Sequence, residues 1–140
     1  MLIIDSCYSG VFITHMKSQL SELYGKVAVL TAAKKTRACY YTGSEENGAC
    51  DFFTHSLLQG IGYKIRIENG VHNRYVGGMP ADSGKTRNGM VTLSEFFNYG
   101  NTWTKKYVKK YKGKSVLHGD PKQKPQYYAN GLGSLVLFGS

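Results

Sequence analysis

Residues 1–12 read MLIIDSCYSGVF, an apolar run that ends abruptly in a polar, turn-forming cluster. Residues 2–4 are apolar and rich in β-branching, the pattern of a central strand buried on both faces of a parallel sheet. Gly10 breaks the extended segment, and apolar side chains then recur at helical spacing until Gly25, where a helix C-cap belongs. The stretch therefore predicts a buried strand, a short turn that contains Cys7, and a helix.

A second buried strand is expected directly after this helix, over residues 26–33 (KVAVLTAA). A strand, a helix and a strand in succession imply a right-handed parallel crossover. Two further helices are expected, over residues 51–58 and over residues 93–111. In front of the second of these, Thr92 and Glu95 have the spacing of a capping box.

The rest of the chain completes the expected architecture. Residues 62–90 hold six glycines and no sustained period, so we expect loops with a short hairpin there, and residues 135–138 (LVLF) predict a last buried strand. This alternation favours one three-layer αβα domain over residues 1–140 with a mainly parallel sheet. Because three strands make a thin parallel sheet, we expect residues 2–4 to need a neighbouring strand that this chain does not contain.

Composition bounds the class of protein. With 140 residues and 41% hydrophobic content, the chain is long enough for one domain with a core. No apolar run is long enough to span a membrane and no secretory signal is recognisable, so we expect no membrane partner, and the compartment is left open. Cys7, Cys39 and Cys50 lack the paired spacing of a zinc site; Cys39 and Cys50 either form a disulfide or stay small thiols.

The formal net charge of +9 invites nucleic acid or an anionic surface as a partner. Much of the excess lies in a run of lysines from residue 105 to residue 114. Within the expected helix, however, Tyr99, Trp103, Tyr107 and Tyr111 recur every four residues and form a stripe that a sheet can bury. We therefore expect a core helix with a solvated lysine face, and no nucleic-acid partner.

A calcium loop is suggested by residues 83–95. Gly89 and Glu95 have the spacing of positions 6 and 12 of an EF-hand loop, and Asn88 has that of position 5. Position 1 would be Gly84, which supplies no carboxylate. We expect no metal and no cofactor, since a turn and a capping box explain these residues; calcium is the alternative interpretation.

Cys7 falls at the carboxyl end of the first predicted strand, where open α/β sheets bind their ligands. Its sulfur would lie near the N-terminus of the following helix, whose dipole and free N–H groups favour a thiolate, the nucleophilic form. Gly10 would let the backbone turn sharply without a Cβ clash. Taken alone, a cysteine at such a position more often simply fills a strand end, but the combination of Cys7 with Asp5, Ser9 and Gly10 favours a nucleophile.

The sequence resembles the caspase-like cysteine peptidases, in particular the bacterial caspase, metacaspase and clostripain-type members. Five elements carry the resemblance, in the family's order and across nearly the whole chain. They are DSCYSG at residues 5–10, VLTAA at 29–33, DFFTHSLLQG at 51–60, GMVTLSE at 89–95 and KPQ at 124–126.

The resemblance implies a cysteine endopeptidase with the caspase-haemoglobinase fold. Cys7 would attack the scissile carbonyl of a peptide or protein substrate, its backbone N–H would help to hold the oxyanion, and Gly10 would shape the turn. In members that cleave after basic residues, the Asp two positions before the nucleophile lines the S1 pocket, so Asp5 would bind Arg or Lys at P1. Asp5 has an alternative role as a helix N-terminal carboxylate that stabilises the turn.

The general base departs from the family pattern. Caspase-type enzymes carry the catalytic His about 50 residues before the Cys, whereas only six residues precede Cys7. None of the four histidines, His15, His55, His72 and His118, matches the family's position. We therefore expect this chain to be the C-terminal portion of the domain, inactive alone, with the His on a missing N-terminal half.

Specificity is a second departure. Residues 34–37 (KKTR) stand where related sequences often carry acidic residues, and their charge would disfavour a basic P1 residue if it faces the pocket, unless Glu45 and Glu46 compensate. The rival to the peptidase, from another class, is a non-catalytic caspase-like scaffold or basic binding module that keeps the fold without the Cys–His dyad.

Overall fold

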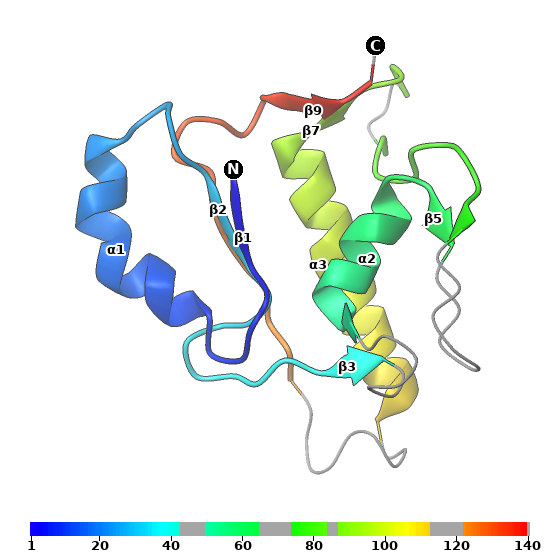
Figure 1. The fold of residues 1–140 in the computed structure, drawn as a ribbon, viewed down its shortest axis with the longest axis horizontal. Helices are drawn as coiled ribbons and strands as arrows, with labels where there is room; N and C mark the ends of the chain where they lie inside the picture. The colour runs from blue at the N-terminus through cyan, green and yellow to red at the C-terminus, as the bar shows by residue number, and fades with distance from the viewer. Residues whose placement is uncertain (43–49, 65–73, 84–86, 113–121, 140) are drawn as a thin grey trace.

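The computed structural model describes residues 1–42, 50–64, 74–83, 87–112 and 122–139, which form a mixed α/β structure. Its main sheet has three strands in the order β1-β2-β8. In Figure 1, helix α1 lies on one side of this sheet, and helices α2 and α3 lie together on the other side. The elements of this layer arrangement are β1 (Leu2–Ile4), α1 (Gly10–Glu22), β2 (Val29–Thr31), α2 (Phe52–Gly60), α3 (Leu93–Tyr111) and β8 (Gln126–Tyr128).

The sheet is mixed, so the expectation of a mainly parallel sheet is wrong. β1 and β2 pair in parallel, as the crossover predicts, with Leu2 opposite Val29 and Ile4 opposite Thr31. β8 then pairs antiparallel with β2. No strand was expected over the three residues of β8, which are too few to show a period-2 pattern and become a strand through their pairing with β2.

Among the described residues, three antiparallel ribbons of two strands lie outside the main sheet. The predicted last strand belongs to one of them: β9 pairs with β7, and Leu135 and Val136 are each 45% exposed. It is therefore not a buried strand of the main sheet, which corrects the prediction. The predicted hairpin within residues 62–90 is confirmed by β5 and β6. The ribbons are β3 (Tyr41–Thr42) with β4 (Cys50–Asp51), β5 (Tyr63–Lys64) with β6 (Arg74–Tyr75), and β7 (Val91–Thr92) with β9 (Val136–Phe138).

All three predicted helices are confirmed, and their ends follow from local chemistry. Thr92 and Glu95 form the predicted capping box at the start of α3. The Asp51 side chain caps α2 by accepting from the N–H groups of Phe53 and Thr54. α1 ends just before Gly25, which takes the left-handed conformation at φ +73°.

The hydrophobic core lies between the sheet and the α2–α3 pair. β2 is fully buried, and Phe53 of α2 meets Phe97 of α3 edge-on at 6.1 Å between ring centroids. Gly100 permits this close helix packing, because a Cβ there would lie 2.6 Å from the Leu57 side chain. The predicted aromatic stripe of α3 is only half-buried at Tyr99, Trp103 and Tyr107, and it packs beside α2 rather than under the sheet.

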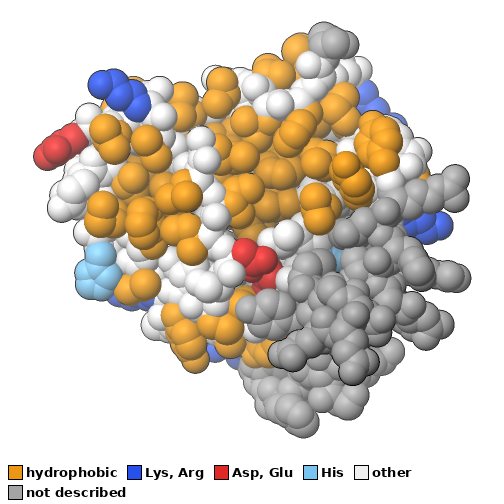
Figure 2. Space-filling model, viewed as in Figure 1, with side chains coloured by type: hydrophobic (Ala, Val, Ile, Leu, Met, Phe, Trp, Pro, Cys, Tyr) orange, Lys and Arg blue, Asp and Glu red, His pale blue; other side chains and the backbone are white. Residues whose placement is uncertain are grey.

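β1 is an edge strand of the described sheet, and it is not buried on both faces as its apolar sequence predicts. Leu2 is 41% exposed and Ile3 is 39% exposed, and in the described part of the chain no strand pairs with their outer side. Helix α1 also leaves much of its apolar surface open: of its side chains only Leu20 is buried. Figure 2 shows hydrophobic side chains gathered over this face, across β1 and α1.

Candidate active site

The turn that carries Cys7 contains a strained residue. Tyr8, directly after Cys7, has φ 60°, a left-handed conformation that costs a non-glycine residue of order 1–3 kcal/mol. Gly10 is not in that region; a Cβ there would meet the Lys35 backbone nitrogen at 2.7 Å and the Ala33 carbonyl oxygen at 2.8 Å. The sharp turn expected at Gly10 is therefore made by Tyr8, and Gly10 is required by the close approach of residues 33–35.

Cys7 lies at the carboxyl end of β1, as the sequence predicts, and it is exposed. Its sulfur contacts a residue that sequence analysis did not connect with it. The Cys39 N–H donates to Cys7 Sγ at 3.2 Å, and the Sγ atoms of Cys7 and Cys39 are 3.0 Å apart. Cys39 itself is 5% exposed. The nucleophile candidate thus lies over a buried second thiol.

The hydrogen-bond donor to the Cys7 sulfur is not the helix N-terminus that the sequence predicts. The first N–H groups of α1 are already bonded: Gly10 to the Ala33 carbonyl, Val11 to Tyr8 and Phe12 to Ser9. They do not donate to the Cys7 sulfur, and the donor there is Cys39 instead. The Cys7 N–H has no hydrogen-bond acceptor among the residues that the structure describes, so it stays available to an incoming oxyanion.

Asp5 is exposed and bridges from the Cys7 turn to helix α2. Its Oδ2 accepts a hydrogen bond of 2.6 Å from Thr54 Oγ1 in the first turn of α2. Asp51, the buried N-cap of the same helix, lies within electrostatic reach of Asp5. Burial, and after it the charge of Asp5, raise the pKa of Asp51 to about 7.

Gln123 ties this acidic pair to the sheet. Its side-chain amide donates to Asp51 Oδ2 at 2.7 Å and to the Ala32 carbonyl at 3.0 Å, while its Oε1 accepts from the Tyr40 N–H at 3.1 Å. Gln123 is buried, so these bonds satisfy polar groups that water does not reach. Its partners are up to 91 residues away in the chain, and no local pattern marks it.

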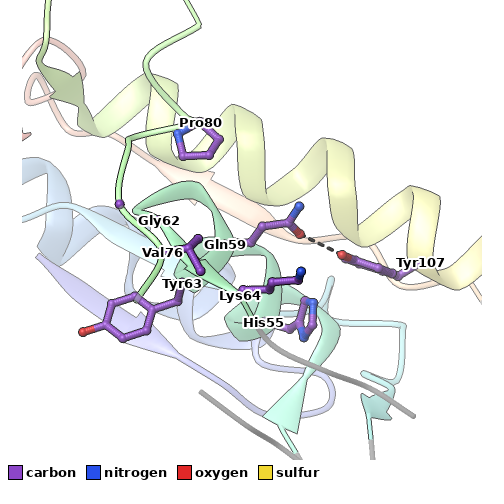
Figure 3. A pocket seen from close by; sticks show the side chains of 9 residues that line it. His55, Gln59, Gly62, Tyr63, Lys64, Val76, Pro80 and Tyr107 are labelled. Atoms are coloured by element: carbon purple, nitrogen blue, oxygen red, sulfur yellow. Dashed lines mark hydrogen bonds between the residues drawn. The ribbon is translucent and has the colours of Figure 1, made fainter. Parts of the chain in front are cut away.

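Neither described histidine is bonded to Cys7. His15 is exposed on α1. His55 is 2% exposed, its ring meets Tyr107 edge-on at 4.7 Å between centroids, and burial lowers its pKa to about 4. His55 lines a separate cavity of about 370 Å³ between α2, α3 and the β5–β6 ribbon. Figure 3 shows this cavity, where Tyr107 donates to Gln59. His72 and His118 lie outside the described residues.

The remaining sequence-based candidates have local roles or fall outside the described chain. Gly89 donates its N–H to Asp82, and Glu95 is occupied by the capping box, while Gly84 of the suggested calcium loop is not described. Within the described ranges no His, Cys, Asp and Glu side chains cluster as metal ligands. Glu45, Glu46 and the Cys50 side chain lie outside the description.

The helices of the described segments include none with the length and apolarity needed to cross a bilayer. Lys105, Lys106, Lys109 and Lys110 are exposed along α3, as the solvated-face interpretation predicts. The segment of residues 34–37 borders the Cys7 turn, since the Arg37 carbonyl accepts from the Tyr8 N–H at 2.9 Å.

Comparison with protein-family models, with curated proteins and with solved structures finds no match.

Proposed function

We propose that this chain carries the nucleophile of a caspase-like cysteine endopeptidase, within a three-layer αβα domain of that family's fold. One observation carries the proposal: Cys7 is exposed at the carboxyl end of an edge strand, directly before the strained Tyr8 and helix α1. Strain of this kind persists where surrounding structure holds a functional group in position. Here the bonds from Tyr8 to Arg37 and from Gly10 to Ala33 hold it.

In this proposal the general base is a histidine on a segment beyond this chain, which pairs with the free edge of β1. The exposed side chains of Leu2 and Ile3 support this, because an apolar edge strand normally needs a covering neighbour. A strand added there runs beside β1, so residues at its end lie next to the Cys7 turn. An incoming imidazole can approach Cys7 because its thiol is exposed.

The proposed reaction follows from these positions. The Cys7 thiolate attacks the scissile carbonyl carbon, and the Cys7 N–H, which bonds to no acceptor in the described residues, donates to the oxyanion that forms. The imidazolium then protonates the leaving amine. Water, deprotonated by the same imidazole, hydrolyses the thioester and releases the second product. The Cys39 N–H, already directed at Cys7 Sγ, stabilises negative charge on the sulfur before attack.

Asp5 is proposed to select a basic P1 residue. Its exposed carboxylate comes two residues before Cys7 and is oriented by the Thr54 hydroxyl, which leaves it able to bind a guanidinium or ammonium group. The nearby Asp51 adds negative potential when it is ionised. The Arg37 side chain lies on a segment next to the turn and works against this preference if it faces the pocket.

The test uses the full product of the reading frame that encodes this chain, in reducing buffer, with fluorogenic peptides that carry Arg, Lys or Asp at P1. We expect cleavage after Arg or Lys, a loss of about 10³-fold or more for Cys7→Ala, and retained activity for Cys50→Ala. Asp5→Asn should lower kcat/KM for Arg and Lys substrates by about tenfold or more. Undiminished cleavage by Cys7→Ala would disprove the proposal.

A second candidate, a basic binding module, is favoured by one observation. Five lysines line a groove of about 310 Å³ beside the end of α3: Lys105, Lys109, Lys112, Lys122 and Lys124. Such a groove attracts polyanions. If the full-length protein cleaves no peptide but binds heparin with an affinity that falls steeply with salt, and Lys105→Ala/Lys109→Ala weakens that binding, this candidate replaces the peptidase.

A further inference from the structure

The two thiols at the candidate active site are close enough to react with each other. Cys7 Sγ and Cys39 Sγ are 3.0 Å apart, although the residues are 32 positions apart in the chain, and no disulfide joins them. A disulfide bond is about 2.05 Å long. Closing it therefore requires the sulfurs to approach by about 1 Å.

This proximity is held by backbone bonds on both sides of the pair. The Tyr8 N–H donates to the Arg37 carbonyl at 2.9 Å, and the Gly10 N–H donates to the Ala33 carbonyl at 2.7 Å. The Cys39 N–H donates to Cys7 Sγ itself. The turn with Cys7 and the segment that follows β2 are thus bonded along their length, so the folded chain keeps the sulfurs together.

The two thiols differ in access, which assigns them different roles. Cys7 is exposed, so a dissolved oxidant reaches it. Cys39 is 5% exposed beneath it and is shielded from direct attack. An exposed thiol next to a buried partner is the arrangement in which the first is oxidised and the second resolves it.

We propose that Cys7 and Cys39 form a reversible oxidative modification site, at which a hydroperoxide converts the two thiols into an intramolecular disulfide. In the first step the Cys7 thiolate attacks the outer peroxide oxygen. An S–O bond forms, the O–O bond breaks, and the departing alkoxide takes a proton to become an alcohol, or water when the oxidant is hydrogen peroxide. The Cys7 sulfur loses two electrons and the peroxide gains them.

In the second step the Cys39 sulfur attacks the sulfenic sulfur of Cys7. The S–S bond forms, the S–O bond breaks, and hydroxide leaves with the Cys39 proton as water. Thiol–disulfide exchange with a small dithiol reverses the modification. The site does not depend on the proposed peptidase activity; if that activity exists, the disulfide occupies the nucleophile and switches it off until it is reduced.

The experiment treats the full chain with a small excess of hydrogen peroxide, blocks remaining thiols, and maps the linkages by mass spectrometry. Trypsin alone leaves Cys39 and Cys50 on one peptide, residues 38–64, so digestion is combined with a Glu-specific protease that cuts at Glu45 and Glu46. We expect a dithiothreitol-sensitive link between the Cys7 and Cys39 peptides, in wild type and in Cys50→Ser alike. A Cys39–Cys50 link, or intermolecular links in its place, would overturn the proposal.

Cys39→Ser supplies a second readout, because Cys7 then has no resolving thiol. In that variant we expect dimedone to trap sulfenic acid on Cys7, and irreversible sulfinic acid to accumulate about tenfold faster than in wild type. Equal rates of sulfinic acid formation would count against the site. The wild-type linkage map remains decisive if Cys39→Ser does not fold, and since neither readout uses peptide cleavage, failure here is separable from failure of the peptidase proposal.

Discussion

Replacing Gly10 with alanine tests the contact that holds the Cys7 turn to the sheet. Gly10 has an ordinary helical φ, so alanine is not disfavoured by conformation. The added Cβ would instead meet three backbone atoms under 3.0 Å away, in Ala33, Lys34 and Lys35. Overpacking of this kind costs about 1–3 kcal/mol, and the Gly10–Ala33 hydrogen bond that the displacement breaks contributes about 1 kcal/mol.

The helix propensity of alanine returns at most about 1 kcal/mol at this position. We therefore expect Gly10→Ala to lower the free energy of unfolding by about 1–3 kcal/mol, measured by urea denaturation followed by circular dichroism. Lys17→Ala, exposed on the same helix, is the matched control and should change stability by less than about 0.5 kcal/mol. The formation of the Cys7–Cys39 disulfide should also slow in Gly10→Ala. A Gly10→Ala protein as stable as wild type would show that residues 33–35 do not press on the turn.

Two further substitutions and a change of pH should alter the stability of the fold. The Asn130 side-chain amide donates at 2.8 Å to the carbonyls of Leu20, Leu23 and Val27, and a carboxylate in its place would repel all three. Asn130→Asp should therefore lower the free energy of unfolding by about 3 kcal/mol or more in the same urea assay. An equal loss of stability in Asn130→Ala would argue against repulsion as the cause. Gly100→Ala should cost about 1–2 kcal/mol, since its Cβ would press on side chains of α2; an unchanged thermal midpoint would contradict this. The pKa of Asp51 rises from 3.8 to about 7 on folding, so its contribution to stability is full below pH 4 and is lost as the pH rises through 7. The pKa of His55 falls from 6.5 to about 4 on folding, so His55 makes the free energy of unfolding increase with pH and masks the effect of Asp51. In His55→Leu we therefore expect the free energy of unfolding to decrease from pH 4 to pH 8. An increase over that range would contradict the prediction.

The sequence predicts the helices and the first crossover because their signals are local. The capping box of Thr92 and Glu95 and the glycine after α1 each act within a few residues, and all are found where expected. The parallel pairing of β1 and β2 follows from chain connectivity alone. These features depend on propensity and period, which a short window of sequence contains.

Features that depend on distant contacts escape such a window. β8 has three residues and becomes a strand because the free side of β2 accepts it. Cys39 and Gln123 belong to the candidate site because Cys39 contacts Cys7, 32 positions away in the chain, and Gln123 bonds to Asp51, 72 positions away. The left-handed Tyr8 runs against its residue type, since sequence rules assign such a turn to the nearby glycine. At all these points tertiary contacts override local preference, as is common near functional sites.

The most direct test of Cys7 as a nucleophile is covalent labelling at stoichiometric dose. The full-length protein is reduced and treated with a peptidyl ketone that carries Arg at P1 and a leaving group beside the carbonyl, and the adduct is located by mass spectrometry. We predict modification of Cys7, with none at Cys39 or Cys50, and its loss in Asp5→Asn when the probe is limiting. Equal labelling of the three cysteines, or labelling that spares Cys7, would contradict the nucleophile assignment.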